Sequence, residues 1–152
     1  MSPKSGSAPR GYFEYTVYPL EGVWDISDEA KKANPGKLDK NTLVFDLMIR
    51  QPDFVTEEYA LETISKVSKK KPNPLLEKVK FSIIDEGDCI QMLHTGPYDN
   101  EPDSFRMMED FCSKNSLKRK SKIHREIYLS DARKVSSEKL KTVLRFQADK
   151  QF

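Results

Sequence analysis

The amino-acid sequence predicts an α+β fold, in which a mostly antiparallel sheet carries helices on one face. Segments whose apolar residues alternate with a period of two, typical of half-buried strands, are mixed along the chain with segments of helical spacing. The length of 152 residues suits a single domain. Because the chain contains 8 Phe, 6 Tyr and 1 Trp, it has more core-forming aromatic residues than a disordered protein.

The first part of the chain is expected to contain strands after a polar leader. Residues 1–11 are small, polar and turn-prone, so we expect a disordered leader. Residues 12–20 are rich in aromatic and β-branched side chains and predict a strand, closed by Pro19 and followed by a short strand over 23–26. Residues 27–40 have too few apolar positions to bury a face, which predicts a solvated loop or a frayed helical turn.

The middle of the chain predicts a strand, a helix and a hairpin. Apolar residues alternate over 42–50, as in a strand. Thr56 is a good N-cap for a helix that Pro72 prevents from continuing. Two strands, 79–84 and 89–95, are joined by an acidic, glycine-containing turn and should form a hairpin.

The last part predicts two further helices that flank a strand. The spacing of apolar residues predicts a helix over 101–114, with Asn115 as a left-handed terminator. Residues 123–129 alternate like a strand. Ser136 should cap a final helix with a packing face made of Leu140, Val143 and Leu144.

Charge and composition exclude several classes of protein. The 26 Lys and Arg nearly cancel the 24 Asp and Glu, which argues against nucleic acid as the main partner. The sequence has neither a membrane-length apolar run nor a signal peptide, so we expect a cytoplasmic protein without membrane attachment. Cys89 and Cys112 are expected to be reduced thiols. His94 and His124, the only histidines, lack further ligands at metal-binding spacing, so we expect no metal and no cofactor.

Glu126 is the most informative candidate for chemistry. Within 123–129, alternation should put Ile123, Arg125, Ile127 and Leu129 on one face, whose apolar members should face the helices, and should put His124, Glu126 and Tyr128 on the other. A carboxylate in the middle of a strand is costly unless it faces water, a basic partner or a cationic ligand. Desolvation would raise its pKa toward the range of a general base. The alternative is a solvent-exposed glutamate on an open sheet face.

Asp46 is a second carboxylate on a strand that otherwise reads as core. If both strands belong to one sheet, Asp46 and Glu126 could share a cavity. Such a pair would suit acid/base chemistry or a cation, but the sequence does not fix their separation. The residues expected to line the cavity are Val44, Met48, Met92 and Tyr128. Separately, the basic run 118–122 is a candidate anion patch, or alternatively a solvated connection.

Several motifs resemble the GyrI-like small-molecule-binding domain family. They are YPLEGVW at 18–24, LMIRQPDFVTEE at 47–58, EGDCIQMLHTGPY at 86–98, HTGPYDNEPDSF at 94–105 and HREIYLSDARKVSSEKLKTVLRF at 124–146. The resemblance implies a domain over 12–146 with a tail over 147–152. It also implies two strand–helix–strand–strand halves around a ligand cleft. Because family members begin with a strand and a helix, we expect the first half to lack these elements.

The resemblance also implies a function. Related domains are effector sensors in multidrug-responsive regulators, where a glutamate matching Glu126 meets cationic aromatic drugs. Stand-alone members are reported to hydrolyse cyclopropanoid DNA-alkylating compounds. Glu126 would then activate water. Tyr128 or His94 would donate a hydrogen bond to the substrate oxygen that gains negative charge when the cyclopropane opens. The expected ligand-binding residues are Trp24, Asp46, Met48, Met92, His94, Tyr98 and His124.

Three functional classes stay open at this point. The first is a small-molecule-binding protein for planar aromatic or cationic toxic compounds that hydrolyses cyclopropanoid ones. The second is a binding-only sensor or sequestering protein. The third is a degenerate interaction domain, favoured because Leu43–Asp46 replaces a tryptophan-rich strand of the stand-alone relatives.

Overall fold

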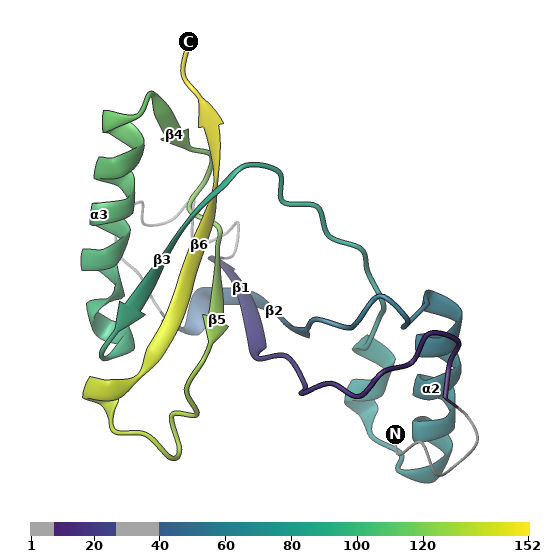
Figure 1. Ribbon diagram of the computed structural model, residues 1–152. Coiled ribbons are helices and arrows are strands. Elements are labelled where there is room, and N and C mark those ends of the chain that lie inside the picture. Colours follow the sequence, from purple (N-terminus) through teal and green to yellow (C-terminus); the bar gives the residue numbers. More distant parts are fainter. Residues whose placement is uncertain (1–7, 27–39) are drawn as a thin grey trace. The chain divides into compact units, whose positions relative to one another are not determined.

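The computed structural model describes residues 8–26 and 40–152 (Figure 1). The chain divides into two compact units, Met1–Tyr18 with Gln51–Asp85 and Pro19–Arg50 with Glu86–Phe152. Most of the predicted leader over 1–11 and nearly all of the predicted loop over 27–40 lie outside the described residues. No helix in the described parts is both long enough and apolar enough to span a membrane.

The larger unit is built on a sheet that the described residues form with six strands. These are β1 (Leu20–Ile26), β2 (Leu43–Ile49), β3 (Cys89–Thr95), β4 (Leu117–Arg119), β5 (His124–Tyr128) and β6 (Lys141–Lys150). The spatial order is β2-β1-β5-β6-β3, and β4 pairs with the C-terminal end of β6. Every pairing is antiparallel, which confirms the predicted α+β class.

The core of this unit lies between α3 (Glu101–Lys114) and β6. Along β6, buried residues alternate with more exposed ones, so that one face of the strand is apolar. Leu144 and Phe146 from that face pack with Met108 and Cys112 of α3, and Ala148 completes the cluster. Figure 1 shows α3 running alongside β3 and β6. The helix therefore covers the face of the sheet to which Leu144 belongs.

The register places Glu126 on this same face. In antiparallel pairs, directly opposite residues point to the same side of the sheet. Glu126 lies opposite Leu144 on β6 and opposite Gly22 on β1. The expectation that Ile123, Ile127 and Leu129 face the helices is therefore wrong. The reason is that β6, with its large buried residues, determines which face α3 covers, and β5 follows by register.

The face away from α3 carries a network of ion pairs. Arg125, which is buried, binds Glu21 Oε2 at 2.6 Å and Glu86 Oε1 at 3.0 Å. Arg145 Nη1 lies 2.8 Å from Glu86 Oε2. Burial alone would raise the pKa of Glu86, but the hydrogen bonds and charges of the two arginines lower it below its usual value. These ion pairs explain how Arg125 can lie between Ile123 and Ile127 on the same face of the sheet.

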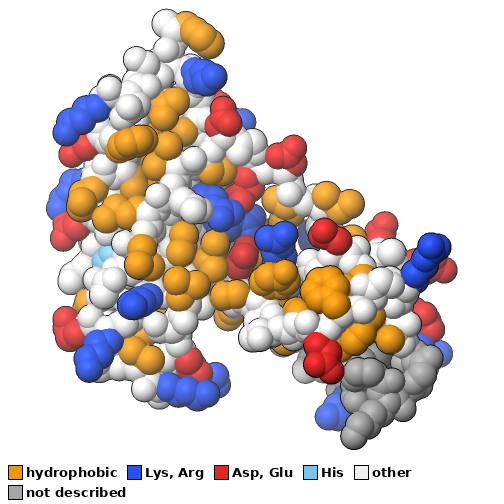
Figure 2. All heavy atoms as spheres, in the orientation of Figure 1, with side chains coloured by type: hydrophobic (Ala, Val, Ile, Leu, Met, Phe, Trp, Pro, Cys, Tyr) orange, Lys and Arg blue, Asp and Glu red, His pale blue; other side chains and the backbone are white. Residues whose placement is uncertain are grey.

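The smaller unit contains α2 (Glu57–Lys70), and it confirms the predicted N-cap. The Thr56 side chain accepts a hydrogen bond from the Tyr59 N–H at 3.2 Å, which satisfies one of the unpaired amides of the first turn. Tyr12 and Phe13 pack against Phe54, with ring centroids 5.3 Å and 5.1 Å away. Hydrophobic side chains are nevertheless exposed on both units (Figure 2).

Two predicted strands do not form. Residues 12–19 form no strand, and β1 begins only at Leu20. The aromatic side chains that suggested a strand instead pack on Phe54 within the smaller unit. Residues 79–84 also lack a strand, and Ile83 is 92% exposed, so the predicted hairpin is absent.

The predicted final helix is strand β6. Only Ser137–Lys139 forms a short 3-10 helix. Leu140, Val143 and Leu144 fit helical spacing, but the alternation that continues to Ala148 is the pattern that the fold uses. The residues 147–150, expected to begin a tail, therefore belong to the sheet. At the end of α3, Ser116 with φ 53° is the left-handed residue, rather than Asn115.

Leu144→Ala tests the position of the core. Leu144 has 0% exposure, so removing its side chain should leave a cavity and lower the free energy of unfolding by about 3–5 kcal/mol. The matched control is Leu93→Ala on neighbouring β3, where the side chain is 50% exposed and the loss should stay below about 1 kcal/mol. Urea denaturation measures both. Equal losses would contradict a core between α3 and β6.

Candidate functional site

Glu126 lies in the middle of β5 with a hydrogen-bond donor on each side. Alternation along the strand puts His124 and Tyr128 on the same face. His124 Nε2 is 2.9 Å from Glu126 Oε1, and the Tyr128 hydroxyl donates to Oε2 at 2.7 Å. Burial alone would raise the pKa of Glu126, but the hydrogen bonds from His124 and Tyr128 outweigh it and lower the pKa below its usual value. Glu126 is thus a buried, ionised carboxylate.

A second buried carboxyl, Glu101, faces Glu126 from the first residue of α3. Its exposure is 7%. Burial, the negative charge of Glu126 and a hydrogen bond between the two carboxyls raise the pKa of Glu101 to about 8. At neutral pH Glu101 therefore keeps its proton while Glu126 is ionised. Glu101 Oε1 is buried and has no hydrogen-bond partner among the described residues.

Sequence reasoning missed Glu101. An acidic residue at the start of a helix is usually explained by the helix dipole, and this glutamate also precedes Pro102, a typical helix-start residue. The available signal was its place inside the motif HTGPYDNEPDSF, which also contains His94 and Tyr98.

Trp24 extends the hydrogen-bond network through Tyr128. Its Nε1–H donates to the Tyr128 hydroxyl oxygen at 2.9 Å. Burial and the hydrogen bond to Glu126 raise the pKa of Tyr128 well above its usual value, so the phenol keeps its proton. A Cβ at Gly22 would lie 2.6 Å from Trp24 Nε1 and 3.2 Å from the Tyr128 oxygen. A glycine at position 22 therefore leaves the space that the Trp24 indole needs to reach the Tyr128 hydroxyl.

Aromatic rings surround this network. The ring of Phe45 lies 4.8 Å from that of Trp24, and the ring of Tyr98 lies 6.1 Å from that of Tyr128. Phe105 from α3 packs edge-on against His124 at 4.7 Å. Phe45 is 50% exposed and Tyr98 39% exposed, so apolar ring surface beside the buried carboxyls is open to solvent.

Asp46 does not join Glu126. Asp46 lies opposite Val23, and Val23 lies opposite Arg125, so Asp46 belongs to the face away from α3. Met48 is on that face too, where its Sδ accepts from Arg125 Nη1 at 2.9 Å. Met92, opposite Leu144, lies on the α3 side and packs against the core. The expected cavity between Asp46 and Glu126 is therefore wrong, and Glu101 is the second acid.

His94 is close to the network, but both its ring nitrogens have protein partners. Nδ1 is 2.8 Å from Ser104 Oγ and Nε2 is 2.9 Å from the Pro97 carbonyl oxygen. With both nitrogens engaged, His94 has no ring N–H left for the ligand oxygen that we expected it to bind.

The cluster contains three side chains of metal-ligating type, Glu101, His124 and Glu126. One atom from each lies within 4.8 Å of the others, the one such grouping among the described residues. Within this cluster, His124 Nε2 and the Tyr128 hydroxyl already hydrogen-bond to the Glu126 carboxylate.

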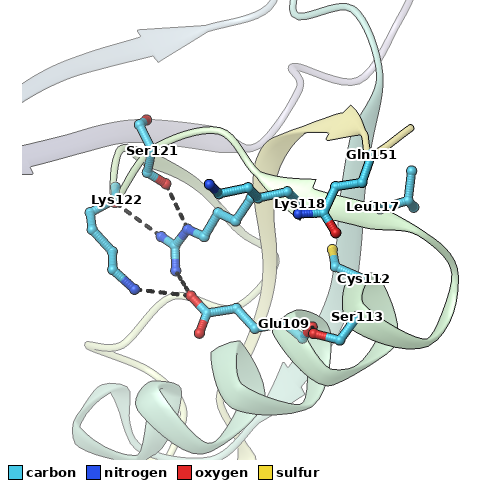
Figure 3. Close-up of a pocket in the computed structure, with 9 residues that line it drawn as sticks. Glu109, Cys112, Ser113, Leu117, Lys118, Ser121, Lys122 and Gln151 are labelled. Atoms are coloured by element: carbon cyan, nitrogen blue, oxygen red, sulfur yellow. Dashed lines mark hydrogen bonds and ion pairs between the residues drawn. The ribbon is translucent and has the colours of Figure 1, made fainter.

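A separate hollow lies between α3, β4 and the residues that follow β4 (Figure 3). Its volume is about 370 Å³, and Glu109, Arg119 and Lys122 are among its lining residues. Arg119 donates to Glu109 Oε1 at 2.8 Å, and Lys122 Nζ lies 3.1 Å from the same oxygen. The basic run over 118–122 is here, but two of its side chains, Arg119 and Lys122, share an ion pair with Glu109. The hollow therefore offers less positive charge than the sequence suggested.

Gly22→Ala tests the contact between Trp24 and Tyr128. The added methyl group should push the indole away, break its hydrogen bond and shift the emission of Trp24, the single tryptophan. The free energy of unfolding should fall by about 1–3 kcal/mol. Val23→Ala, on the opposite face, is the control and should leave the emission unchanged. An unchanged spectrum for Gly22→Ala would refute the arrangement.

Glu101→Gln tests the raised pKa. In the unfolded chain Glu101 releases its proton near pH 4.5, whereas the folded state holds it to about pH 8. The stability of the wild type should therefore fall, relative to that of the variant, as the pH rises between these values, by a few kcal/mol in total, in the order of magnitude expected from proton linkage.

Denaturation at a series of pH values measures this difference. Glu109→Gln is the matched control, because the pKa of Glu109 is lowered and its effect on stability lies below about pH 4.5. If the curves for the wild type and Glu101→Gln stay parallel up to pH 9, the pKa of Glu101 is not raised.

Known proteins resemble this chain over nearly its whole length. The family model for the GyrI-like small molecule binding domain matches residues 12–148. A solved structure of a hydrolase from Listeria innocua is 34% identical in sequence, with a TM-score of 0.82. The match covers 98% of this chain and 71% of the hydrolase chain. The structure of an uncharacterized conserved protein from the same organism is 35% identical, with a TM-score of 0.80. This match covers 97% of the present chain and 72% of the other.

Among curated proteins, none matches the chain. The match of the family model extends from the extended segment at Tyr12 to Ala148 in β6, and so includes Glu101, Glu126 and every aromatic residue around them. The chain therefore belongs to the GyrI-like small-molecule-binding domain family.

Proposed function

We propose that this protein binds flat aromatic compounds beside Glu126 and hydrolyses those that contain a strained, conjugated cyclopropane ring. The observation that carries the proposal is the buried pair of one ionised and one protonated carboxyl, Glu126 and Glu101. Two carboxyls held in opposite protonation states are a common basis for acid/base catalysis. Family membership supports a small-molecule ligand, and the hydrolase name of a 34% identical structure is in keeping with water addition.

The aromatic surroundings suit a flat ligand. Phe45 and Tyr98 expose ring surface, while Trp24 and Tyr128 are held in place by their mutual hydrogen bond. Aromatic rings bind flat conjugated compounds through stacked and edge-on contacts. The negative charge of Glu126 would favour ligands with a positive charge next to their ring system.

The proposed reaction adds one water molecule across a carbon–carbon bond. The carboxylate of Glu126 accepts a proton from water while the water oxygen bonds to a cyclopropane carbon. The ring bond to that carbon breaks, and its electron pair moves through the conjugated system to the oxygen of the carbonyl group conjugated with the cyclopropane. The acid form of Glu101 donates its proton to that oxygen. One proton has then passed to Glu126 and one has left Glu101, so a proton transfer between them restores the pair.

A binding-only function is the second candidate, and one observation favours it. Hydrogen bonds from His124 and Tyr128 already stabilise the charge of Glu126 and lower its pKa. A carboxylate of low pKa is a weaker base but a good counter-charge for a cation. In that case the protein would sequester or sense its ligand without changing it.

Glu126→Gln separates the two candidates. With a cyclopropane-bearing DNA alkylator as substrate, the wild type should form a product heavier by one water, measured by mass spectrometry. The variant should lose at least about 100-fold in rate because the general base is gone, while the affinity for an uncharged substrate changes little.

Glu109→Gln provides the control, since it removes the same charge from α3 outside the cluster. Quenching of Trp24 emission reports binding in each sample. Quenching by the wild type without product would refute hydrolysis and leave the binding function. If Glu126→Gln and the wild type turn over at equal rates, Glu126 is not the base.

A further inference from the structure

His94 connects the end of β3 to the start of α3. It is buried, with 5% exposure, and belongs to the strand that precedes the helix. Its Nδ1 lies 2.8 Å from Ser104 Oγ in the first part of α3, and its Nε2 lies 2.9 Å from the carbonyl oxygen of Pro97. One imidazole thus bonds to two points of the chain, one on either side of Glu101 in the sequence.

The partners identify which nitrogen carries the proton. A carbonyl oxygen only accepts, so Nε2 must carry the hydrogen that Pro97 receives. In neutral histidine Nδ1 is then an acceptor, and the Ser104 hydroxyl donates to it. Both ring nitrogens then have a hydrogen-bond partner, as expected for a buried histidine.

The segment between the two anchors contains the residues that face β5. Gly96 makes the turn after β3 with φ 125°, and its N–H donates to the Leu140 carbonyl at 2.9 Å. After Pro97, a short 3-10 helix, Tyr98–Asn100, leads into α3 at Glu101. Tyr98 packs near Tyr128, and a carboxyl oxygen of Glu101 lies within 4.8 Å of one of Glu126. Fixing Pro97 and Ser104 therefore restricts where Tyr98 and Glu101 can lie.

We propose that His94 is a positioning residue, which ties the first turn of α3 to β3 and so holds Glu101 against Glu126. It acts through Pro97 and Ser104, and it does not bind the ligand. The inference deepens the proposed function, because it assigns the support of the same carboxyl pair, but it concerns the protein without ligand and is measured there.

The test follows the titration of Glu101 by carbon-13 NMR in protein labelled at the glutamate carboxyls, without ligand. Glu101→Gln identifies its signal. In the wild type this carboxyl should titrate near pH 8. In His94→Ala, loss of the anchors should let Glu101 move away from Glu126 toward water, and its pKa should fall by at least about one unit. His94→Gln, whose amide can donate to Pro97 and accept from Ser104, should recover part of the difference.

Cys112→Ala is the matched control for lost stability. Cys112 is a buried core residue of α3, beyond the two anchors, so its truncation should destabilise the fold and leave the titration of Glu101 unchanged. If His94→Ala does not fold, Ser104→Ala removes one anchor alone and should lower the pKa of Glu101 by a smaller amount.

The proposal fails if Glu101 still titrates near pH 8 in folded His94→Ala, or in Ser104→Ala where the first variant is unfolded. It also fails if nitrogen-15 NMR finds the His94 proton on Nδ1. None of these results depends on turnover. A protein without hydrolase activity could still show the shift, and an active hydrolase could lack it, so this proposal and the proposed function fail separately.

Discussion

Two carboxyl groups, Glu101 and Glu126, are buried with oxygens within 4.8 Å of each other, and they cannot both be ionised at a tolerable cost. Among the described residues, side-chain donors lie on the Glu126 side of this pair. His124 and Tyr128 stabilise the charged form of Glu126, while Glu101 has a buried oxygen without a partner and keeps its proton. This unequal environment distinguishes a base from an acid.

The fold builds this environment from separate elements. Period-two alternation in β5 fixes His124, Glu126 and Tyr128 on one face, and the register with β6 makes it the face that α3 covers. Gly22 on β1 leaves the space through which Trp24 reaches Tyr128. The start of α3 supplies Glu101. On the opposite face, Glu21 and Glu86 pair with Arg125, which lies between His124 and Glu126 in the sequence. These ion pairs stabilise the buried charge of Arg125 within β5.

Much of this arrangement could be predicted from the sequence, but only locally. The range of α3, the N-cap at Thr56 and the side-by-side placement of His124, Glu126 and Tyr128 follow from spacing alone. The identity of the second acid could not be predicted from the sequence. The pairing register of the strands decides that Asp46 lies on the other face, and the packing of α3 on the sheet brings Glu101 to Glu126. The final helix predicted after Ser136 is wrong because Leu140, Val143 and Leu144 also fit the period of a strand. Only the pairing of β6 with β3 and β5 decides between the two periods.

The most direct test of the shared proton is infrared spectroscopy of the protein at pH 7. A buried protonated carboxyl absorbs apart from ionised carboxylates, and carbon-13 labelling of glutamate shifts its band. The wild type should show one such protonated glutamate, and Glu101→Gln should abolish the band because Glu126 is then left ionised between His124 and Tyr128. A wild-type spectrum without a protonated carboxyl at pH 7, or a band that persists in Glu101→Gln, would contradict the account.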